Sequence, residues 1–169
     1  IRPDGSTCEA GELGQIAIRR PDPVMFLEYW GRPDALRDKF IGDWMTTGDQ
    51  GIADDDGYFH FVGRDDDVIT SSGYRIGPGE IEECLIRHPA VSIAAVIGVP
   101  DPVRGEVVKA FVVAAPGATA SEALAGELQE HVRTRLAPYE VPRTIDFVAE
   151  LPLTVTGKIR RAELRRLEA

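Results

Sequence analysis

The sequence predicts an α+β protein, and three observations carry this prediction. Residues 91–99 and 107–114 are nearly continuous apolar runs, rich in Val and Ile, with the length of buried strands. Residues 124–136 place apolar side chains on one face at helical spacing. The chain before position 66 reads mostly as short strands and turns. We therefore expect residues 66–169 to form a small domain with a β hairpin, a three-stranded sheet and flanking helices, and residues 1–65 to be the β-rich end of a larger domain.

The elements of the first 65 residues are predicted from local patterns. Residues 14–19 alternate in polarity, which indicates a strand, and residues 33–40 favour a short helix with proline in its first turn. Residues 47–49 are expected to form a polar loop. The acidic run 54–57 is typical of a hairpin turn. A calcium-binding EF-hand loop would need glycine at its sixth position, where Phe59 stands, so the turn is preferred.

The hairpin and first helix of the second part follow from turn and breaker residues. Val68 and Ile69 favour a strand, and Ser72-Gly73 is a turn signal because glycine tolerates a positive φ. Residues 77–79 then break the chain before a helix that is expected to open at Glu80, where carboxylates suit the positive end of the helix dipole.

The remaining elements complete the predicted order. Proline 89 ends the first helix, and residues 100–105 link the two apolar strands. Thr119 and Glu122 have capping-box spacing at the start of the next helix. Residues 144–148 favour a third strand and residues 160–167 a terminal helix. From position 66 onward the expected order is hairpin, helix, strand, strand, helix, strand, helix.

Composition excludes several classes of function. The 169 residues are 43% apolar, which is ordinary for a globular protein, and the formal net charge is −9. Such an acidic chain is a poor match for nucleic acid or an anionic membrane surface, and no apolar run is long enough to span a bilayer. Cys8 and Cys84 suit neither a disulfide framework nor a metal site, which favours a reducing, cytoplasmic location. The three histidines share no ligand spacing, so no metal site is predicted.

Four segments, in order along the chain, resemble the motifs of the adenylate-forming (AMP-binding) superfamily. The central one combines Gly-Arg-x-Asp-x-x-Ile with Ser-Gly-Tyr-Arg-Ile and Glu-Ile-Glu, and is similar to the hinge motif of that family. One short match would be weak, but four in order are specific. The segments are 44–49 (Trp-Met-Thr-Thr-Gly-Asp), 63–82, 136–142 (Leu-Ala-Pro-Tyr-Glu-Val-Pro) and 152–158 (Pro-Leu-Thr-Val-Thr-Gly-Lys).

The resemblance implies a two-step reaction. Members of the family activate a carboxylic acid with ATP to an acyl-adenylate and then pass the acyl group to a thiol, while the small C-terminal domain rotates between the steps. The residues after the hinge resemble acetyl-, medium-chain or aromatic-acid CoA ligases, so ATP, coenzyme A and Mg²⁺ are the implied cofactors and a small carboxylic acid is the implied substrate. Two alternatives stay open: the adenylation domain of a peptide synthetase, and a non-catalytic nucleotide- or CoA-binding module.

The resemblance also assigns roles to single residues. Asp49 would bind the ribose hydroxyls of ATP, and Arg64 its ribose and phosphate. Asp66 would be the hinge, whereas its two neighbours are interpreted as a solvated acidic turn. Lys158 would be the catalytic cation of adenylation, although a lone lysine after glycine is ordinarily just solvated. Ser72, Gly73 and Tyr74, accompanied by Arg75, would line the pantetheine tunnel, and Arg104, Arg133 and Arg135 would hold the nucleotide of CoA. For Arg133 and Arg135, satisfaction of a helix dipole is an equally good explanation.

Some parts expected from the resemblance have no counterpart in the sequence. Thr70 stands where many members carry lysine. The family's phosphate loop, acyl pocket and magnesium-binding glutamate do not occur between residues 1 and 169. We therefore expect an additional N-terminal domain as partner, Mg²⁺ ligands outside this segment, and no acyl-adenylate formation by these residues alone.

Overall fold

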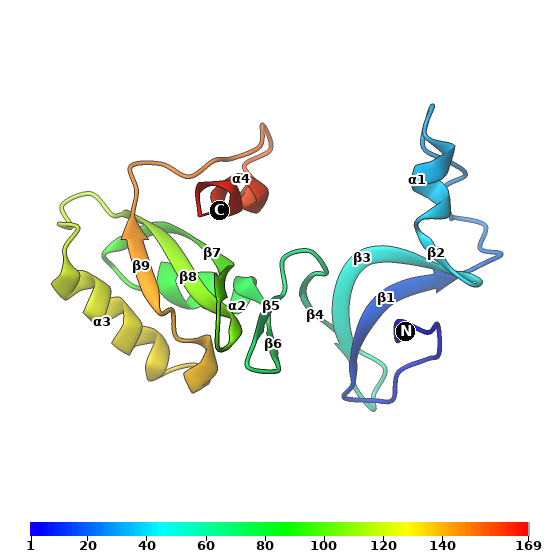
Figure 1. The fold of residues 1–169 in the computed structure, drawn as a ribbon, viewed down its shortest axis with the longest axis horizontal. Coiled ribbons are helices and arrows are strands. Elements are labelled where there is room, and N and C mark those ends of the chain that lie inside the picture. The colour runs from blue at the N-terminus through cyan, green and yellow to red at the C-terminus, as the bar shows by residue number, and fades with distance from the viewer. Residues whose placement is uncertain (169) are drawn as a thin grey trace. The chain divides into compact units, whose positions relative to one another are not determined.

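The computed structural model describes residues 1–168 and divides into two compact units, Ile1–Asp66 and Asp67–Ala169. We call them the N-terminal unit and the C-terminal unit, and each is described by itself (Figure 1). The division falls at the peptide bond that follows Asp66, the residue predicted to be a hinge.

The N-terminal unit is a four-stranded antiparallel sheet built around its third strand. That strand pairs with β1 along one edge and with β2 and then β4 along the other. The short helix ends at Arg37, earlier than predicted, and the chain passes directly into β2. The elements are β1 (Leu13–Arg19), α1 (Pro33–Arg37), β2 (Phe40–Ile41), β3 (Trp44–Ala53) and β4 (Phe59–Arg64).

The polar loop predicted over residues 47–49 is wrong, because these residues lie within β3. Strand partners on both edges satisfy the backbone hydrogen-bonding groups of β3. A bulge between Gln50 and Gly51 accommodates the shift in register with β4. Gly48 has φ +87°, a left-handed conformation that few other residues adopt. The hairpin turn over residues 54–57 is confirmed: the Asp54 carboxylate accepts the backbone N–H groups of Asp56 and Tyr58.

The C-terminal unit confirms the predicted α+β class and the order of elements. Its sheet has the order β6-β5-β8-β7, with β9 parallel to β8. The hairpin is not separate from the predicted three-stranded sheet, because Ser71 pairs with Gly105 and joins it to β8. The elements are β5 (Ile69–Ser71), β6 (Tyr74–Ile76), α2 (Pro78–Ile86), β7 (Val91–Asp101), β8 (Gly105–Ala114), α3 (Glu122–Arg133), the 3₁₀ turn η1 (Pro138–Glu140), β9 (Thr144–Phe147) and α4 (Arg161–Leu167).

Helix ends differ from the sequence prediction where local hydrogen bonds decide. Helix α2 begins at Pro78 rather than Glu80, because proline is well suited to the first helical turn. The cap of α3 is Ser121, whose hydroxyl accepts the N–H of Leu124 at 3.2 Å, and not Thr119. Helix α3 stops at Arg133, so Arg135 lies beyond its end.

The sheet of the C-terminal unit is covered on both faces, which explains its continuous apolar strands. Successive side chains of a strand point to opposite faces. Accordingly Val96 packs with α2 and α3, whereas its neighbour Ile97 packs with Leu164 of α4. Residues buried on the first face include Ile81, Leu85, Val108, Val112, Leu128 and Val132, and those on the second include Ala95, Phe111 and Leu151.

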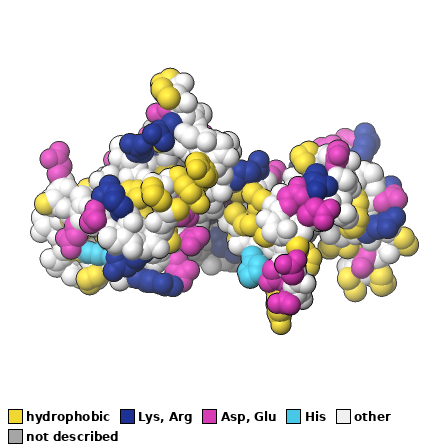
Figure 2. Space-filling view, turned by 90° about the horizontal axis from the view of Figure 1, so that it is seen from below, with side chains coloured by type: hydrophobic (Ala, Val, Ile, Leu, Met, Phe, Trp, Pro, Cys, Tyr) yellow, Lys and Arg dark blue, Asp and Glu magenta, His cyan; other side chains and the backbone are white. Residues whose placement is uncertain are grey.

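Apolar side chains also reach the surface of the N-terminal unit. Val24, Leu27 and Trp30, all between β1 and α1, are 88, 89 and 95% exposed. Figure 2 shows hydrophobic side chains among charged groups of both signs on the viewed face. Three such exposed apolar side chains therefore lie within one segment of seven residues, 24–30.

A buried ion network ties the two ends of the C-terminal unit together. Arg161 of α4 donates to both carboxylate oxygens of Glu82 on α2, at 2.8 and 2.6 Å, and to Asp67 at 3.2 Å. Arg165 donates to the other Asp67 oxygen at 2.7 Å. The prediction of a solvated turn is wrong for Asp67, whose side chain is only 12% exposed. Glu82 also accepts the backbone N–H of Val96.

We predict that Arg161→Ala lowers the free energy of unfolding of the C-terminal unit by about 3–5 kcal/mol. The substitution leaves the Glu82 carboxylate buried without its ionic partner, which is more costly than losing an exposed pair. Urea unfolding measures the change. The matched control is Arg166→Ala, an exposed arginine of the same helix, which should shift stability by no more than about 0.5 kcal/mol. Equal effects of the two substitutions would contradict the assignment.

A second prediction concerns pH. Burial raises the pKa of Glu82 above its ordinary 4.5, although the hydrogen bonds and charge of Arg161 oppose the shift. Ionisation of Glu82 therefore costs stability as pH rises through the folded-state pKa, and this cost is absent below 4.5. Compared with Glu82→Gln, the unfolding free energy of the wild type should improve as pH falls from 7 toward 4.5. A difference between the two proteins that stays constant across this window would refute the prediction.

Candidate functional site

Three predicted site residues come together at the end of the β3–β4 ladder. Asp49 and Arg64 are direct cross-strand partners, with 3.8 Å between Nη1 of Arg64 and Oδ1 of Asp49. Nε of Arg64 donates to Oδ1 of Asp66 at 3.0 Å. All three side chains retain solvent exposure, so an open carboxylate lies beside a guanidinium. Such a pair can accept hydrogens from sugar hydroxyls and donate to anionic oxygens.

Asp65 is exposed, as expected for a turn, but its carboxylate is held. The side-chain amide of Gln50, which is buried, donates to one oxygen, and that of Gln15 donates to the other at 3.3 Å. The backbone N–H of Asp65 also donates to the carbonyl of Gly48 at 2.9 Å. Residues from two strands of the N-terminal unit, β1 and β3, therefore fix the chain immediately before Asp66.

The β5–β6 turn gathers a second group of predicted residues. Ser72 and Gly73 have φ of +50° and +85°, the left-handed pair that a tight hairpin turn requires. The N–H of Ser72 donates to the carbonyl of Arg104 at 2.9 Å. Tyr74 stacks on Tyr139, with ring centroids 4.1 Å apart and an interplanar angle of 12°. Arg75 follows Tyr74 in β6, and both residues are exposed.

The three arginines predicted to bind the CoA nucleotide do not line one pocket. Arg104 lines a small pocket with Tyr139 and Arg143, and Arg133 lines a pocket of about 310 Å³ that also contains Arg143. The two pockets are neighbours, since they share Pro138, Val141 and Arg143. Arg133 itself is paired with Glu130 one turn earlier.

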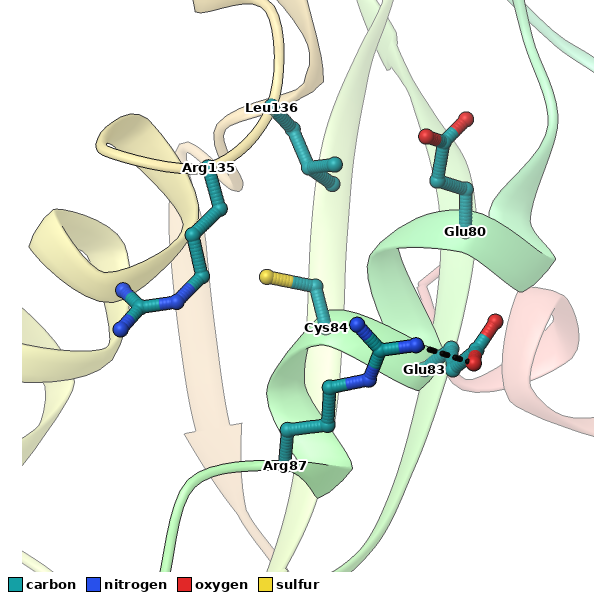
Figure 3. A pocket seen from close by; sticks show the side chains of 6 residues that line it. All are labelled: Glu80, Glu83, Cys84, Arg87, Arg135 and Leu136. Atoms are coloured by element: carbon teal, nitrogen blue, oxygen red, sulfur yellow. Dashed lines mark hydrogen bonds and ion pairs between the residues drawn. The ribbon is translucent and has the colours of Figure 1, made fainter.

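Arg135 lines a different pocket, of about 410 Å³, which Figure 3 shows from close by. The pocket is open between α2 and the end of α3. Arg87 is paired across its rim with Glu83 at 2.6 Å, and Nη1 of Arg135 donates back to the carbonyl of His131. Burial raises the pKa of the Cys84 thiol here, which favours the protonated form of this buried free cysteine.

Lys158 lies in an exposed loop that short-range hydrogen bonds shape. The loop is closed by the carbonyl of Lys158, which accepts the N–H of Thr154 at 2.8 Å, and by the Thr154 hydroxyl, which accepts the N–H of Lys158 at 3.0 Å. Leu153 and Ile159 pair across its base. The loop leads directly into α4, whose Arg161 belongs to the buried ion network. The ammonium is therefore presented on a short, shaped loop.

Sequence reasoning missed four residues that organise these groups. Asp67 was interpreted as part of a solvated turn and Glu82 as a carboxylate at the positive end of a helix dipole. The pairing of Glu82 with Arg161 joins positions 79 residues apart, beyond any local pattern. Arg143 lies directly after the Pro-Tyr-Glu-Val-Pro motif, which was the available signal for its place in the two neighbouring pockets.

Two negative findings concern residues 1–168. No helix in this range is both long and apolar enough to cross a membrane. Within the same residues, His, Cys, Asp and Glu side chains form no group of three or more that could hold a metal ion.

Most of the C-terminal unit matches a known family model. Residues 80–158 match the family model described as "AMP-binding enzyme C-terminal domain", and this range includes the β5–β6 turn's partner residues Arg104 and Tyr139 as well as Lys158. This match confirms the resemblance to adenylate-forming enzymes that the sequence motifs predicted.

The whole chain is related to acyl-CoA synthetases. It is 46% identical over 99% of its length to an uncharacterized acyl-CoA ligase, YtcI, of Bacillus subtilis, and 52% identical over 99% to the mitochondrial acyl-coenzyme A synthetase ACSM4 of Mus musculus. Among solved structures, the anthranilate CoA ligase AuaEII in complex with anthranoyl-AMP matches 99% of the chain with a TM-score of 0.88 and 41% identity. The chain spans about a third of the length of these relatives, namely 32, 30 and 32%.

Proposed function

We propose that this chain serves as the C-terminal part of an ATP-dependent carboxylate–CoA ligase. The observation that carries the proposal is the identity of 46–52% to acyl-CoA synthetases along both units, and not only over the small domain. The proposed reaction converts an acid and ATP to an acyl-adenylate and pyrophosphate, and then transfers the acyl group to the thiol of CoA. AuaEII was solved with an acyl-adenylate, anthranoyl-AMP, which supports the first step as the shared chemistry.

In the proposed site, the N-terminal unit contributes to nucleotide binding. Asp49 accepts hydrogens from the ribose hydroxyls, for which its exposed carboxylate is suited, and Arg64 donates to ribose and phosphate oxygens. The cross-strand pairing of the two residues keeps the guanidinium beside the carboxylate before any ligand arrives, so less ordering is needed on binding. Mg²⁺ would be held by residues outside this segment.

The C-terminal unit contributes two further surfaces. Ser72, Gly73 and Tyr74, with Arg75, line the path of the pantetheine arm, where the absence of a side chain at Gly73 permits close approach to the backbone. Arg104, Arg133 and Arg143 supply positive charge in two neighbouring pockets for the phosphates of CoA. Arg135 lines the separate pocket of Figure 3, so its charge acts on CoA less directly in this proposal.

The rest of the enzyme is the proposed partner of the N-terminal unit. The exposed apolar side chains of Val24, Leu27 and Trp30 suit contact with further protein, which would also supply the phosphate loop and the acyl pocket. A cytoplasmic location rests on the two free thiols alone, and relatives include enzymes named as mitochondrial. The carboxylic acid is expected to be a small, medium-chain or aromatic one.

We predict that Lys158→Ala in the complete enzyme slows acyl-adenylate formation by about 10²–10³-fold. A cation placed where charge develops on the α-phosphate stabilises the transition state more than the ground state. Because the loop carrying Lys158 rotates away with the small domain, thioester formation from supplied acyl-adenylate should be nearly unchanged. The two half-reactions are assayed separately, by ATP–pyrophosphate exchange and by thioester release.

The matched control for this charge is Arg166→Ala, which removes an exposed cation from the following helix and should leave both half-reactions intact. Equal slowing of the two half-reactions by Lys158→Ala would overturn the role of this residue. No thioester formation by the wild type with any carboxylic acid, despite binding of ATP or CoA, would instead favour the non-catalytic module, and transfer only to a carrier-protein thiol would favour the peptide synthetase.

We also predict that Asp66→Pro spares adenylation and slows thioester formation much further. Proline restricts φ to about −65° and removes the N–H, so the residue can no longer absorb the backbone change of a rotation. Asp66→Ala is the control, because it removes the carboxylate paired with Arg64 but keeps the backbone free. If Asp66→Pro reduced both half-reactions to the same extent, Asp66 would be structural and not a hinge.

A further inference from the structure

The three consecutive aspartates at the unit boundary have different surroundings. The Asp65 carboxylate accepts hydrogen bonds from Gln15 and Gln50, and its N–H donates to Gly48, all in the N-terminal unit. The Asp67 carboxylate is bound by Arg161 and Arg165 of the C-terminal unit. The side chain of Asp66, between them, is 68% exposed, and its carboxylate accepts a hydrogen bond from Nε of Arg64 at 3.0 Å.

From this arrangement we propose that Asp65 and Asp67 are positioning residues that confine the rotation of the small domain to Asp66. The inference rests on the proposed function, in which such a rotation occurs. Strand β4 ends at Arg64 and β5 begins at Ile69, so secondary structure alone would leave a connector of several residues, 65–68, free to bend. The two anchored carboxylates reduce this connector to a single pivot.

Confinement matters because the two half-reactions need two defined orientations of one domain. A single pivot has only two soft dihedral angles, whereas a connector of several residues samples many orientations. The ion network also carries the restraint onward: Arg161, which holds Asp67, lies three residues after Lys158 and is bound to Glu82 on α2. Asp67, which follows the pivot, and the loop that bears Lys158 are thus fixed within the same unit.

The asymmetry of the two anchors follows from their chemistry. Asp65 is held by two neutral amides and a backbone hydrogen bond, whereas Asp67 is held by two charged guanidinium groups and is largely buried. Charge-assisted hydrogen bonds are about twice as strong as neutral ones. We therefore choose Asp67→Ala as the more sensitive test.

The experiment is backbone ¹⁵N relaxation on the 169-residue chain. In the wild type, the amides of Asp65 and Asp67 should show order parameters near 0.85, each like its own unit, with a drop confined to Asp66. In Asp67→Ala the low values, below about 0.6, should extend through Val68 to the start of β5. The control Asp55→Ala removes an exposed carboxylate from the β3–β4 turn and should change nothing at residues 65–68.

Two outcomes would overturn the proposal: low order parameters across residues 65–68 in the wild type, or no change in this range in Asp67→Ala. Should Asp67→Ala fail to fold, Arg165→Ala removes one partner of Asp67, leaves the Arg161–Glu82 pair intact, and should loosen Val68 in the same direction. Because no ATP, acid or CoA is used, a failure here leaves the proposed activity standing. Conversely, if the wild type had no ligase activity, the proposal that Asp65 and Asp67 anchor the connector would still stand.

In the complete enzyme, Asp67→Ala should slow both half-reactions by a similar factor, on the order of tenfold or more, because misplacement of about 1 Å can cost 10²-fold. Asp67→Glu keeps a carboxylate within reach of the arginines and should restore most of the rate, a rescue that a merely space-filling role would not give. Loss restricted to one half-reaction would contradict the anchor role.

Discussion

The pairing of Arg161 with Glu82 is the interaction on which the C-terminal unit depends. It joins the terminal helix to α2, and Glu82 in turn accepts the backbone N–H of Val96 in the edge strand β7. A buried pair of this kind adds little net stability compared with a well-packed apolar replacement, but its geometry is demanding. Its value here is in fixing where α4, and therefore the loop before it, must lie.

The same pair connects the fold to the proposed chemistry. Arg161 also binds Asp67, and Lys158 precedes it by three residues, so a single guanidinium links the start of the unit, its core and its exposed catalytic candidate. Placing a catalytic cation on a loop costs precision unless the supporting residues are themselves held. The hydrogen bonds of Thr154 shape this loop from one side, and the ion network holds it from the other.

A different principle organises the N-terminal unit. Its site residues lie on adjacent strands and face one another because antiparallel pairing places Asp49 opposite Arg64. Here the ladder does the positioning, and Gly48 provides the one left-handed residue that the site requires. The two units thus use two solutions to one problem, a strand register in one and a buried charge network in the other.

Much of the architecture was already determined by the sequence. The strands β7 and β8, the helix α3 with its one apolar face, and the Ser72-Gly73 turn depend on local patterns, and the structure confirms each of them. The motifs likewise identified the family, because they record chemistry in contiguous residues. Only the tertiary structure decided that residues 47–49 belong to a strand, that the hairpin joins the main sheet, and that Asp67 is bound by arginines. Each of these features depends on partners far away in the chain. The local sequence around an aspartate in an acidic run is the same whether water or a guanidinium surrounds its carboxylate in the folded protein.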